Sequence, residues 1–401
     1  VAACFIGGFV EFCGGIIGPW LKKRIPRAAL LGTVAGIGFI WMATQGVFDI
    51  LGDPMIGLPV LFVAILGLFG GYMFPKQIPP LVIAIVGGIV YALCLGRIQP
   101  DFSGIGFYIP NPVNSIEHLI DGFAIVAPYL TIIIPVEIYN FIETLDNVEA
   151  SNAAGDNYNV REAQFADGIC TMLSALCGGV IPNTVWLGHA GLKKSEAGIG
   201  YSLISGIVLG LSGIFGLFTF LNSVVPPAVC AITFLWCAVV MVAQAFKDND
   251  RKHYAAIAVA MVPPVADYLY TQVTGALNLA NLQTAVQNSG LNEYAADVTQ
   301  MIKDAGVMWN GVPATKSGAI IIGILLGTMV TFVIDKRLDK VGITALMGYI
   351  LSCFGFIHSA SLGFYPLSPF AIGYLIIAVL SFIFHAGRNT WFKGPDDFDY
   401  V

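Results

Sequence analysis

A polar stripe interrupts an apolar run in the stretch 135–149. On a helix of 3.6 residues per turn, four polar residues fall within about 100° of one another, and they are Asn140, Glu143, Thr144 and Asn147. A carboxylate flanked by amides and a hydroxyl can accept N–H groups from a polar ligand or bind a proton. Because ionisable groups at membrane depth are costly and usually functional, the stripe predicts a ligand site. A solvated end of a membrane span is the alternative interpretation.

A second motif, Gly-Gly-Val-Ile-Pro-Asn-Thr-Val-Trp-Leu-Gly-His-Ala-Gly, occupies 178–191. Pro182 lacks an N–H and disfavours helix just before itself. We therefore expect an extended segment near 180–186 and then a half-helix beginning near Trp186, with free N–H groups at its start. Irregular backbone at membrane depth is tolerated where it lines a cavity, and transporters build substrate sites this way. A re-entrant turn between packed helices is the alternative.

Three further ionisable residues need an explanation. His189 can titrate near neutral pH, so it is a candidate for proton transfer or a packing residue. Glu11 lies at the middle of the first apolar run and needs a partner or a water cavity, unless it only packs between helices. Asp267, after two prolines, is a similar case. The sequence contains no H-E-x-x-H or C-x-x-C motif, so we expect neither a metal site nor a cofactor.

The elements that position these residues must lie in a membrane. Only 11% of the 401 residues are charged and 57% are hydrophobic, whereas about 25% of residues are charged in soluble domains. This apolar excess has to face the lipid bilayer, which excludes a cytosolic enzyme, a nucleic-acid-binding protein and a secreted disulfide scaffold. The formal charge of −6 is too small to imply a nucleic-acid partner.

About 20 apolar residues cross a bilayer as a helix, and thirteen runs are long enough to be spans or parts of spans. They lie near 1–19, 28–48, 56–74, 79–96, 119–141, 166–181, 184–192, 198–221, 226–246, 253–273, 317–335, 341–361 and 367–386. If 166–181 and 184–192 are half-crossings, sixteen Lys and Arg residues fall on one side and three on the other. Cytoplasmic loops are enriched in these residues, so we expect a cytoplasmic C-terminus.

The connecting segments follow from the same spans. We expect 97–118 to form an outside loop and 142–165 to form a polar inside loop. The longest outside segment is 276–314, in which Leu291 to Ile302 is apolar at roughly helical spacing. This stretch is predicted to be an interfacial helix or part of an extracellular helical hairpin.

Several of these stretches resemble the nucleobase–ascorbate transporter family, which includes xanthine, uracil and purine permeases. The sequence 141–147, Phe-Ile-Glu-Thr-Leu-Asp-Asn, resembles the family's eighth helix, and 165–168, Phe-Ala-Asp-Gly, resembles the start of its ninth. The sequence 179–184, Gly-Val-Ile-Pro-Asn-Thr, resembles its broken tenth helix, and 21–27 resembles the link between helices four and five. The similarity covers most of 1–336.

The resemblance implies an all-α polytopic membrane protein with a 7+7 inverted-repeat fold, divided into a core domain and a gate domain. With Glu143 on helix eight, the chain starts at helix four, and the first three helices would lie upstream of Val1. The implied division is 1–20 core, 28–117 gate, 118–222 core, 226–336 gate, and 337–401 two extra spans with a cytoplasmic tail.

The resemblance also implies a substrate site. Glu143 matches the carboxylate that binds ring N–H groups of a base, and Gly188 stands where the family often has a second Glu. The substrate-binding residues implied by the motifs are Glu143, Asn140, Asn147, Thr184, Val185, Gly188 and His189, with Glu143 and His189 as proton-coupling candidates. Family members often form homodimers through the gate domain, in a plasma or inner membrane.

The resulting hypothesis is a secondary-active transporter for a purine- or pyrimidine-type base, driven by proton symport. An anion carrier of the related sulfate/bicarbonate type is the alternative within transport, although a carboxylate at Glu143 would repel such a substrate. An intramembrane enzyme that uses Glu143 and His189 as acid and base, and a sensor that binds a base without moving it, are the alternatives from other classes.

Overall fold

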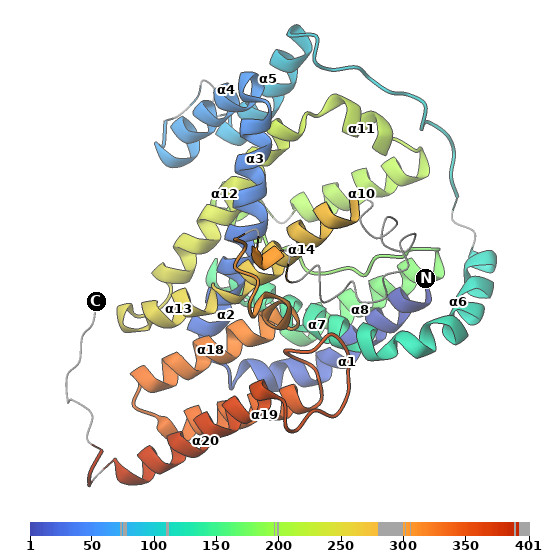
Figure 1. The fold of residues 1–401 in the computed structure, drawn as a ribbon. Helices are drawn as coiled ribbons and strands as arrows, with labels where there is room; N and C mark the ends of the chain where they lie inside the picture. The colour runs from blue at the N-terminus through green and yellow to red at the C-terminus, as the bar shows by residue number, and fades with distance from the viewer. Residues whose placement is uncertain are drawn as a thin grey trace.

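The computed structural model is helical, and it holds no strand in the parts that it describes (Figure 1). These parts are residues 1–72, 74, 78–109, 112–195, 197–198, 200–279, 300, 302–304, 306–388 and 390–392. Four of the helices within these ranges are long and apolar enough to span a membrane: Ala2–Lys22, Arg27–Gly52, Pro227–Lys247 and Pro369–Gly387. The protein is therefore an integral membrane protein with several apolar helices, as the composition predicts.

Helix α1 (Ala2–Lys22) lies directly against α8 (Val160–Leu176). Glycines allow this approach, because a Cβ on Gly8 would lie 2.8 Å from the Gly168 carbonyl oxygen and one on Gly15 would lie 2.5 Å from the Phe165 ring. Helix α8 begins at a side-chain cap, in which Asn159 accepts a hydrogen bond from the Arg161 amide at 3.0 Å. The backbones of α1 and α8 are therefore in contact, and both helices pack beside α7.

The longest helical unit runs from α2 (Arg27–Ile37) through a π-helical stretch, Gly38–Ala43, into α3 (Thr44–Gly52). Helix α12 (Pro227–Lys247) packs along this unit. Helices α4 (Pro54–Ala64) and α5 (Pro80–Cys94) lie at its far end, at the top of Figure 1. Ile50, Ile56 and Ile232 are buried where these helices meet.

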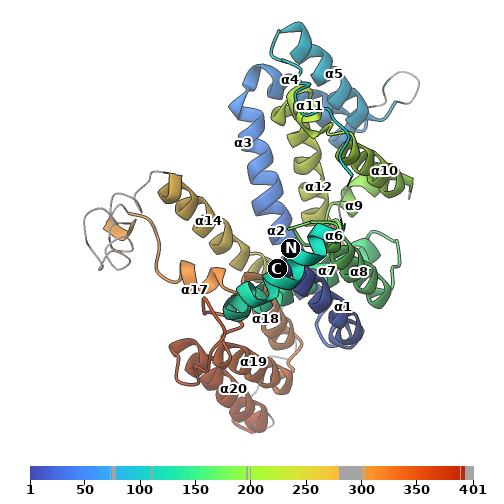
Figure 2. The same cartoon turned by 90° about the vertical axis from the view of Figure 1, so that its right-hand side faces the viewer.

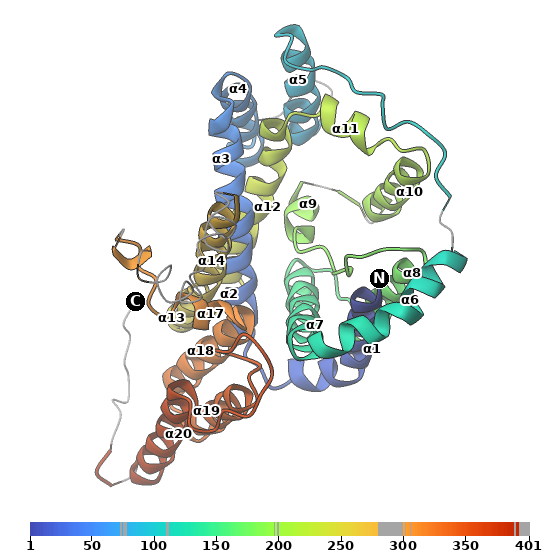
Figure 3. The ribbon, with the colours of Figure 1, turned by 45° about the vertical axis from the view of Figure 1, so that its right-hand side comes forward.

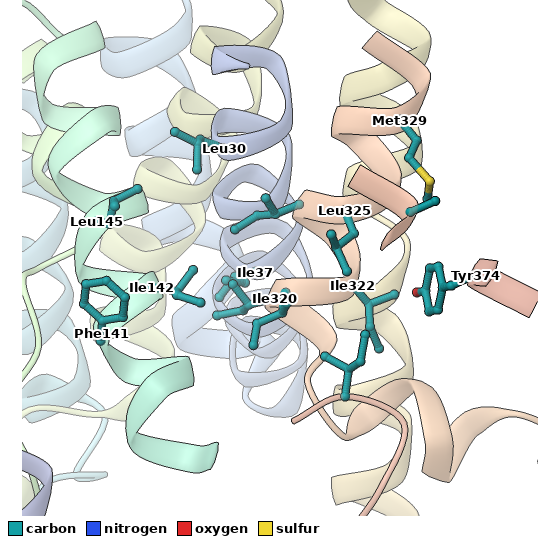
Figure 4. Packing of buried hydrophobic residues seen from close by; sticks show 14 of the residues in the cluster. Leu30, Ile37, Phe141, Ile142, Leu145, Ile320, Ile322, Leu325, Met329 and Tyr374 are labelled. Atoms are coloured by element: carbon teal, nitrogen blue, oxygen red, sulfur yellow. The ribbon is translucent and has the colours of Figure 1, made fainter. Parts of the chain in front are cut away.

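Helix α7 (Leu130–Ala153) follows α6 (Pro112–Val126) and lies beside α2. Its apolar face packs into the main core with α2 and α18 (Ala319–Ile334), where Leu30, Ile142, Leu145, Ile320 and Leu325 are all buried (Figure 4). Burial of a large aliphatic side chain stabilises the fold by about 1.5–3 kcal/mol. One face of α7 is thus fixed by apolar packing, and its polar stripe faces elsewhere.

The C-terminal third begins with α13 (Tyr254–Ala260) and α14 (Pro263–Leu279). After the short α17 (Val312–Lys316) and α18, helices α19 (Leu338–Cys353) and α20 (Pro369–Gly387) pack on each other. Figure 2 shows this last pair at the opposite end of the molecule from α4 and α5. The assignment of all these helices to a core and a gate domain stays a prediction.

Some predicted boundaries are wrong. The expected inside loop 142–165 is mostly helix, because α7 continues to Ala153 and α8 begins at Val160. The run 119–141 is divided at Ala127–Tyr129, and the run 253–273 is divided before Pro263. In each case a proline stands at the division, where its missing N–H and its ring disrupt the helical hydrogen bonding. The predicted helix from Leu291 to Ile302 lies almost entirely outside the described residues.

The run 198–221 is also divided. Helix α10 (Gly200–Ile214) and helix α11 (Phe218–Val224) meet at a bend of 113°. Gly216 in the bend has a φ of 65°, which is a left-handed conformation that glycine adopts without strain.

Candidate functional site

The polar stripe of α7 binds an irregular segment, residues 179–186, that follows α8. The Asn147 side-chain amide donates to the Val185 carbonyl oxygen at 2.8 Å, and the Asn140 amide donates to the Asn183 carbonyl oxygen at 3.2 Å. Between them, the hydroxyls of Thr144 and Thr184 lie 3.1 Å apart. Side chains one turn apart on α7 therefore hold three consecutive residues of the segment.

The segment is irregular for local reasons. Helix α8 ends at Leu176, and Gly178 follows with a φ of 97°, which turns the chain out of the helix. Pro182 prevents helix from resuming, and the Asn183 amide instead donates to the Thr171 hydroxyl at 2.9 Å. Helix resumes only at α9 (His189–Lys194), three residues later than the predicted start near Trp186. The half-helix is thus six residues long.

The segment keeps several hydrogen-bond donors free. The backbone amides of residues 184–188 have no acceptor among the described residues. Glu143, one helical turn before Asn147, is half-buried and forms no hydrogen bond or ion pair within the same part of the structure. Glu143 shares the face of α7 whose Asn140 and Asn147 bind the segment, so this side of α7 offers both donors and an acceptor to a polar ligand.

Trp186 and Gly188 lie against each other among the residues with free amides. A Cβ at position 188 would lie 2.6 Å from the Trp186 ring. A Glu at this position would need the indole to move. Trp186 is 40% exposed and meets the Phe234 ring edge-on at 6.4 Å, so an aromatic face is available beside the free amides.

His189, the first residue of α9, forms hydrogen bonds with the α7–α8 loop and with α10. Its Nε2 lies 2.8 Å from Asp156 Oδ2, and its Nδ1 lies 2.7 Å from the Tyr201 hydroxyl. Since a carboxylate only accepts, Nε2 carries a proton toward Asp156. Lys193 also donates to Asp156, and these hydrogen bonds from Lys193 and His189 lower the pKa of Asp156. This network ties α9 to the turn after α7.

Other carboxyl groups surround α7. Asp167 accepts a hydrogen bond from Thr144 at 3.1 Å. Glu149 pairs with Lys22 at 2.6 Å and with Arg27 at 3.0 Å, which joins α7 to the α1–α2 connection. Asp146 is fully buried, and neither of its oxygens has a hydrogen-bond partner among the described residues. No group of three His, Cys, Asp or Glu in that part of the chain is arranged to hold a metal ion.

A cavity borders each end of α7. One, of about 530 Å³, is lined by Val136 near the start of the helix together with Asp267 and Lys316. The other, of about 330 Å³, is lined by Ala153 at its end together with Lys193 and Lys194. Glu143 lies between these two ends in sequence, and its carboxyl is close enough to Asp267 for the two to repel each other.

The structure thus joins four of the seven predicted site residues through direct contacts. Figure 3 shows α7, α8 and α9 on the same side of the long α2–α3 unit, with α7 beside α2. The four joined residues are Asn140, Asn147, Thr184 and Val185. Glu143 lies on the same face of α7, Gly188 lies against the Trp186 ring, and His189 is turned toward Asp156. Sequence reasoning missed Trp186 and Asp167. The signal for Asp167 was its place in the Phe-Ala-Asp-Gly motif of α8.

Comparison with known proteins gives one family. A family model described as "Permease family", that of xanthine/uracil permeases, matches residues 1–263. The match contains α7, α8, the irregular segment and α9, and it ends where α14 begins. No curated protein matches the chain.

Proposed function

Because the chain belongs to this permease family, the nucleobase–ascorbate transporters, we propose that it is a secondary-active permease for a purine- or pyrimidine-type base. The family is one of transporters rather than enzymes. We further propose proton symport by alternating access, with the base bound between α7 and the irregular segment 179–186. The proposed setting is a plasma or inner membrane with a cytoplasmic C-terminus, and the proposed assembly is a homodimer through the gate domain.

The observation that carries this proposal is that α7 holds the segment with Asn140 and Asn147, on the helix face that also carries the unpaired carboxyl of Glu143, while the amides of residues 184–188 have no acceptor among the described residues. A nucleobase presents N–H donors and carbonyl acceptors in one plane. Glu143 accepts one or two ring N–H groups, while the amides between Thr184 and Gly188 donate to carbonyl oxygens. The half-exposed Trp186 offers a face on which the flat ring stacks.

The bound state depends on the geometry of the segment. Asn140 and Asn147 use their amide N–H groups on the carbonyl oxygens of Asn183 and Val185, so those oxygens point toward α7. The amides on the opposite side of the same peptides are then directed away from α7 side chains and toward the ligand. The two asparagines therefore position the donors without contacting the base themselves.

The two cavities at the ends of α7 support alternating access. A base that enters one cavity reaches Glu143, and a rocking movement of one helical unit against the other opens the second cavity. Protonation of Glu143 in step with base occupancy, and of His189 through its contact with Asp156, are the proposed coupling events. The carboxyls near the site oppose the sulfate/bicarbonate alternative, because Glu143, Asp167 and Asp267 would repel an anion.

Uptake of radiolabelled bases into cells tests the proposal. We expect cells with the wild-type protein to accumulate at least one base from a panel of purines and pyrimidines, and Glu143→Gln to lose at least about tenfold of that uptake, as for a charged hydrogen bond. Glu117→Gln is the matched control, since Glu117 is exposed on α6. Accumulation by Glu143→Gln equal to wild type would remove Glu143 from the mechanism, and sulfate or bicarbonate flux would favour the anion carrier.

A further inference from the structure

Glu11 is a buried carboxyl that the proposed base site does not use. It lies in the middle of α1, and only 1% of its surface is exposed. Neither of its oxygens has a hydrogen-bond partner in good geometry among the described residues. A carboxylate sealed in this way is costly unless a proton or another cation joins it. Packing alone does not account for it, because a Gln or Leu would fill the same space at lower cost.

Carboxyl groups of two of the helices that pack against α1, α8 and α7, act on Glu11. Asp167 from α8 acts on it most strongly, and Glu137 and Glu143 from α7 act on it from further away. Glu137 is itself buried, with one oxygen unpartnered within the described chain, and Gly7 of α1 leaves the space for its carboxyl. The titratable groups of α6 face outward, since Glu117, His118 and Asp121 are exposed.

No basic side chain of the described residues acts on Glu11. Lys22 at the end of α1 and Arg27 at the start of α2 are both engaged with Glu149. The positive charge that this place lacks must therefore come from outside the chain. No group of three His, Cys, Asp or Glu in the described structure is arranged to hold a metal ion here. A proton is the cation that fits.

A hydrogen-bond chain joins this place to the base site. Thr144 lies beside the Glu11 carboxyl and donates to Asp167 Oδ2 at 3.1 Å. Because Thr144 has one hydroxyl hydrogen and gives it to Asp167, Thr184 is the donor in the Thr144–Thr184 contact of 3.1 Å. Thr184 belongs to the segment that presents the free amides. The charge on the Glu11–Asp167 pair thus polarises the hydrogen bonds through Thr144 to Thr184, which end at the proposed base site.

We infer that Glu11, with Asp167 and Thr144, forms a proton-binding site that carries the driving proton and reports its presence to the irregular segment through Thr184. In this step a proton from water on the outside bonds to a carboxylate oxygen of Glu11, and the same O–H bond breaks when the site opens to the cytoplasm. Nothing is oxidised, and one proton moves with each base. The inference rests on the proposed symport and adds a second protonated group to Glu143.

Reconstituted full-length protein separates binding from coupling. Exchange of labelled for unlabelled base needs no net proton movement, whereas accumulation against a gradient does. We expect Glu11→Gln to exchange base at a rate comparable to wild type and to lose about tenfold or more of pH-gradient-driven accumulation. Glu11→Asp, which keeps a titratable carboxyl, is expected to accumulate base with a displaced pH profile. Glu117→Gln should behave as wild type in both assays.

Infrared difference spectra after a pH step give a readout that needs no base. We expect a protonated-carboxyl C=O band in the wild-type protein whose Glu11 component is missing in Glu11→Gln, where the Glu143 component remains, and whose full intensity is present in Glu117→Gln. The inference is overturned if Glu11→Gln accumulates base as wild type does, if it loses exchange together with accumulation, or if the carboxyl band is unchanged. If the wild-type protein exchanges no base, the proposed function fails, and the infrared band still decides whether Glu11 binds a proton.

Discussion

The two sharp breaks in the apolar helices satisfy their backbones in different ways. At the break between α8 and α9, side chains of α7 pair with the backbone. The amides of Asn140 and Asn147 donate to carbonyl oxygens of the segment. At the break between α10 and α11, the backbone groups pair with other backbone groups. The Leu217 amide donates to Ser212, and the amides of Gly106 and Tyr108 donate to Phe215 and Ile214.

This difference in backbone pairing distinguishes the proposed ligand site at the α8–α9 break from the α10–α11 bend. A buried backbone group without a partner costs about 1–3 kcal/mol, so both breaks must be satisfied. Backbone pairing at the α10–α11 bend leaves exposed apolar side chains such as Phe215 and Phe218 around it. Side-chain pairing at the α8–α9 break instead leaves the amides of residues 184–188 without an acceptor among the described residues, beside the helix that carries Glu143. A broken helix indicates ligand binding when a neighbouring helix supplies polar side chains to it.

The largest expected effect comes from the contact that fixes α8. A Cβ on Gly168 would lie 2.5 Å from the Phe12 amide nitrogen and 2.6 Å from the Gly8 carbonyl oxygen, and both atoms are backbone. We expect Gly168→Ala to force α1 from α8 and to destabilise the protein by about 3 kcal/mol. Thermal unfolding followed by fluorescence size exclusion measures this.

Gly210→Ala is the matched control on α10. The space around a Cβ at Gly210 is open, so we expect no loss of stability and a gain of up to about 1 kcal/mol from helix propensity. Equal destabilisation by the two substitutions would mean that the close α1–α8 contact contributes no more to stability than an open glycine position.

The next effect tests the side-chain pairing itself. Asn147 is 2% exposed and donates to the Val185 carbonyl oxygen at 2.8 Å. We expect Asn147→Leu to destabilise the protein by about 2 kcal/mol, because the carbonyl is left unpaired, and to lower the affinity for base because the segment shifts. Binding of labelled base to purified protein checks the second effect. An unchanged affinity would show that the segment needs no support from α7.

A smaller effect is expected at the α9 end of the same break. The pKa of Asp156 is lowered by hydrogen bonds from Lys193 and His189, so its contribution to stability is present above its unfolded pKa of about 3.9 and is lost as the pH falls through its folded pKa. We expect Asp156→Asn to lower Tm at neutral pH. The difference from wild type should stay constant down to about pH 5 and close below about pH 4. A difference that persists in acid would exclude this carboxylate network.

The smallest effect belongs to the α10–α11 region. The Ser223 hydroxyl accepts from the Asp101 amide at 2.9 Å and donates to the Phe220 carbonyl oxygen at 2.7 Å. We expect Ser223→Ala to cost about 0.5–1 kcal/mol of stability and to leave base uptake unchanged. Reduced base affinity in this variant would assign a binding role to the second break as well.

Some features of the fold follow directly from local sequence. Gly178 and Pro182 were sufficient to predict the irregular segment near 180–186, because their backbone restrictions are local. The spacing of Asn140, Glu143 and Asn147 predicted a shared helix face for the same reason. The family resemblance, carried by the motifs in these two stretches, is confirmed by the match to the permease family.

Other features depend on which helices meet, and the sequence alone does not fix that. Asp146 and Glu149 fall in the stretch predicted as a polar inside loop, yet they are buried because α8 and the Lys22 and Arg27 side chains cover this end of α7. The hydrogen bond from Thr144 to Asp167 joins residues 23 positions apart. The closeness of Glu11 to Asp167 requires α1 and α8 to touch through glycines. Such long-range contacts decide which polar residues form the site.

A structure of the protein with a transported base, determined in a lipid nanodisc, tests the central claim most directly. We expect the base to lie with a ring N–H within hydrogen-bond distance of the Glu143 carboxylate and a carbonyl oxygen facing the amides of residues 184–188, while Asn147 keeps its bond to Val185. A base bound elsewhere, or residues 179–186 wound into a continuous helix, would contradict it.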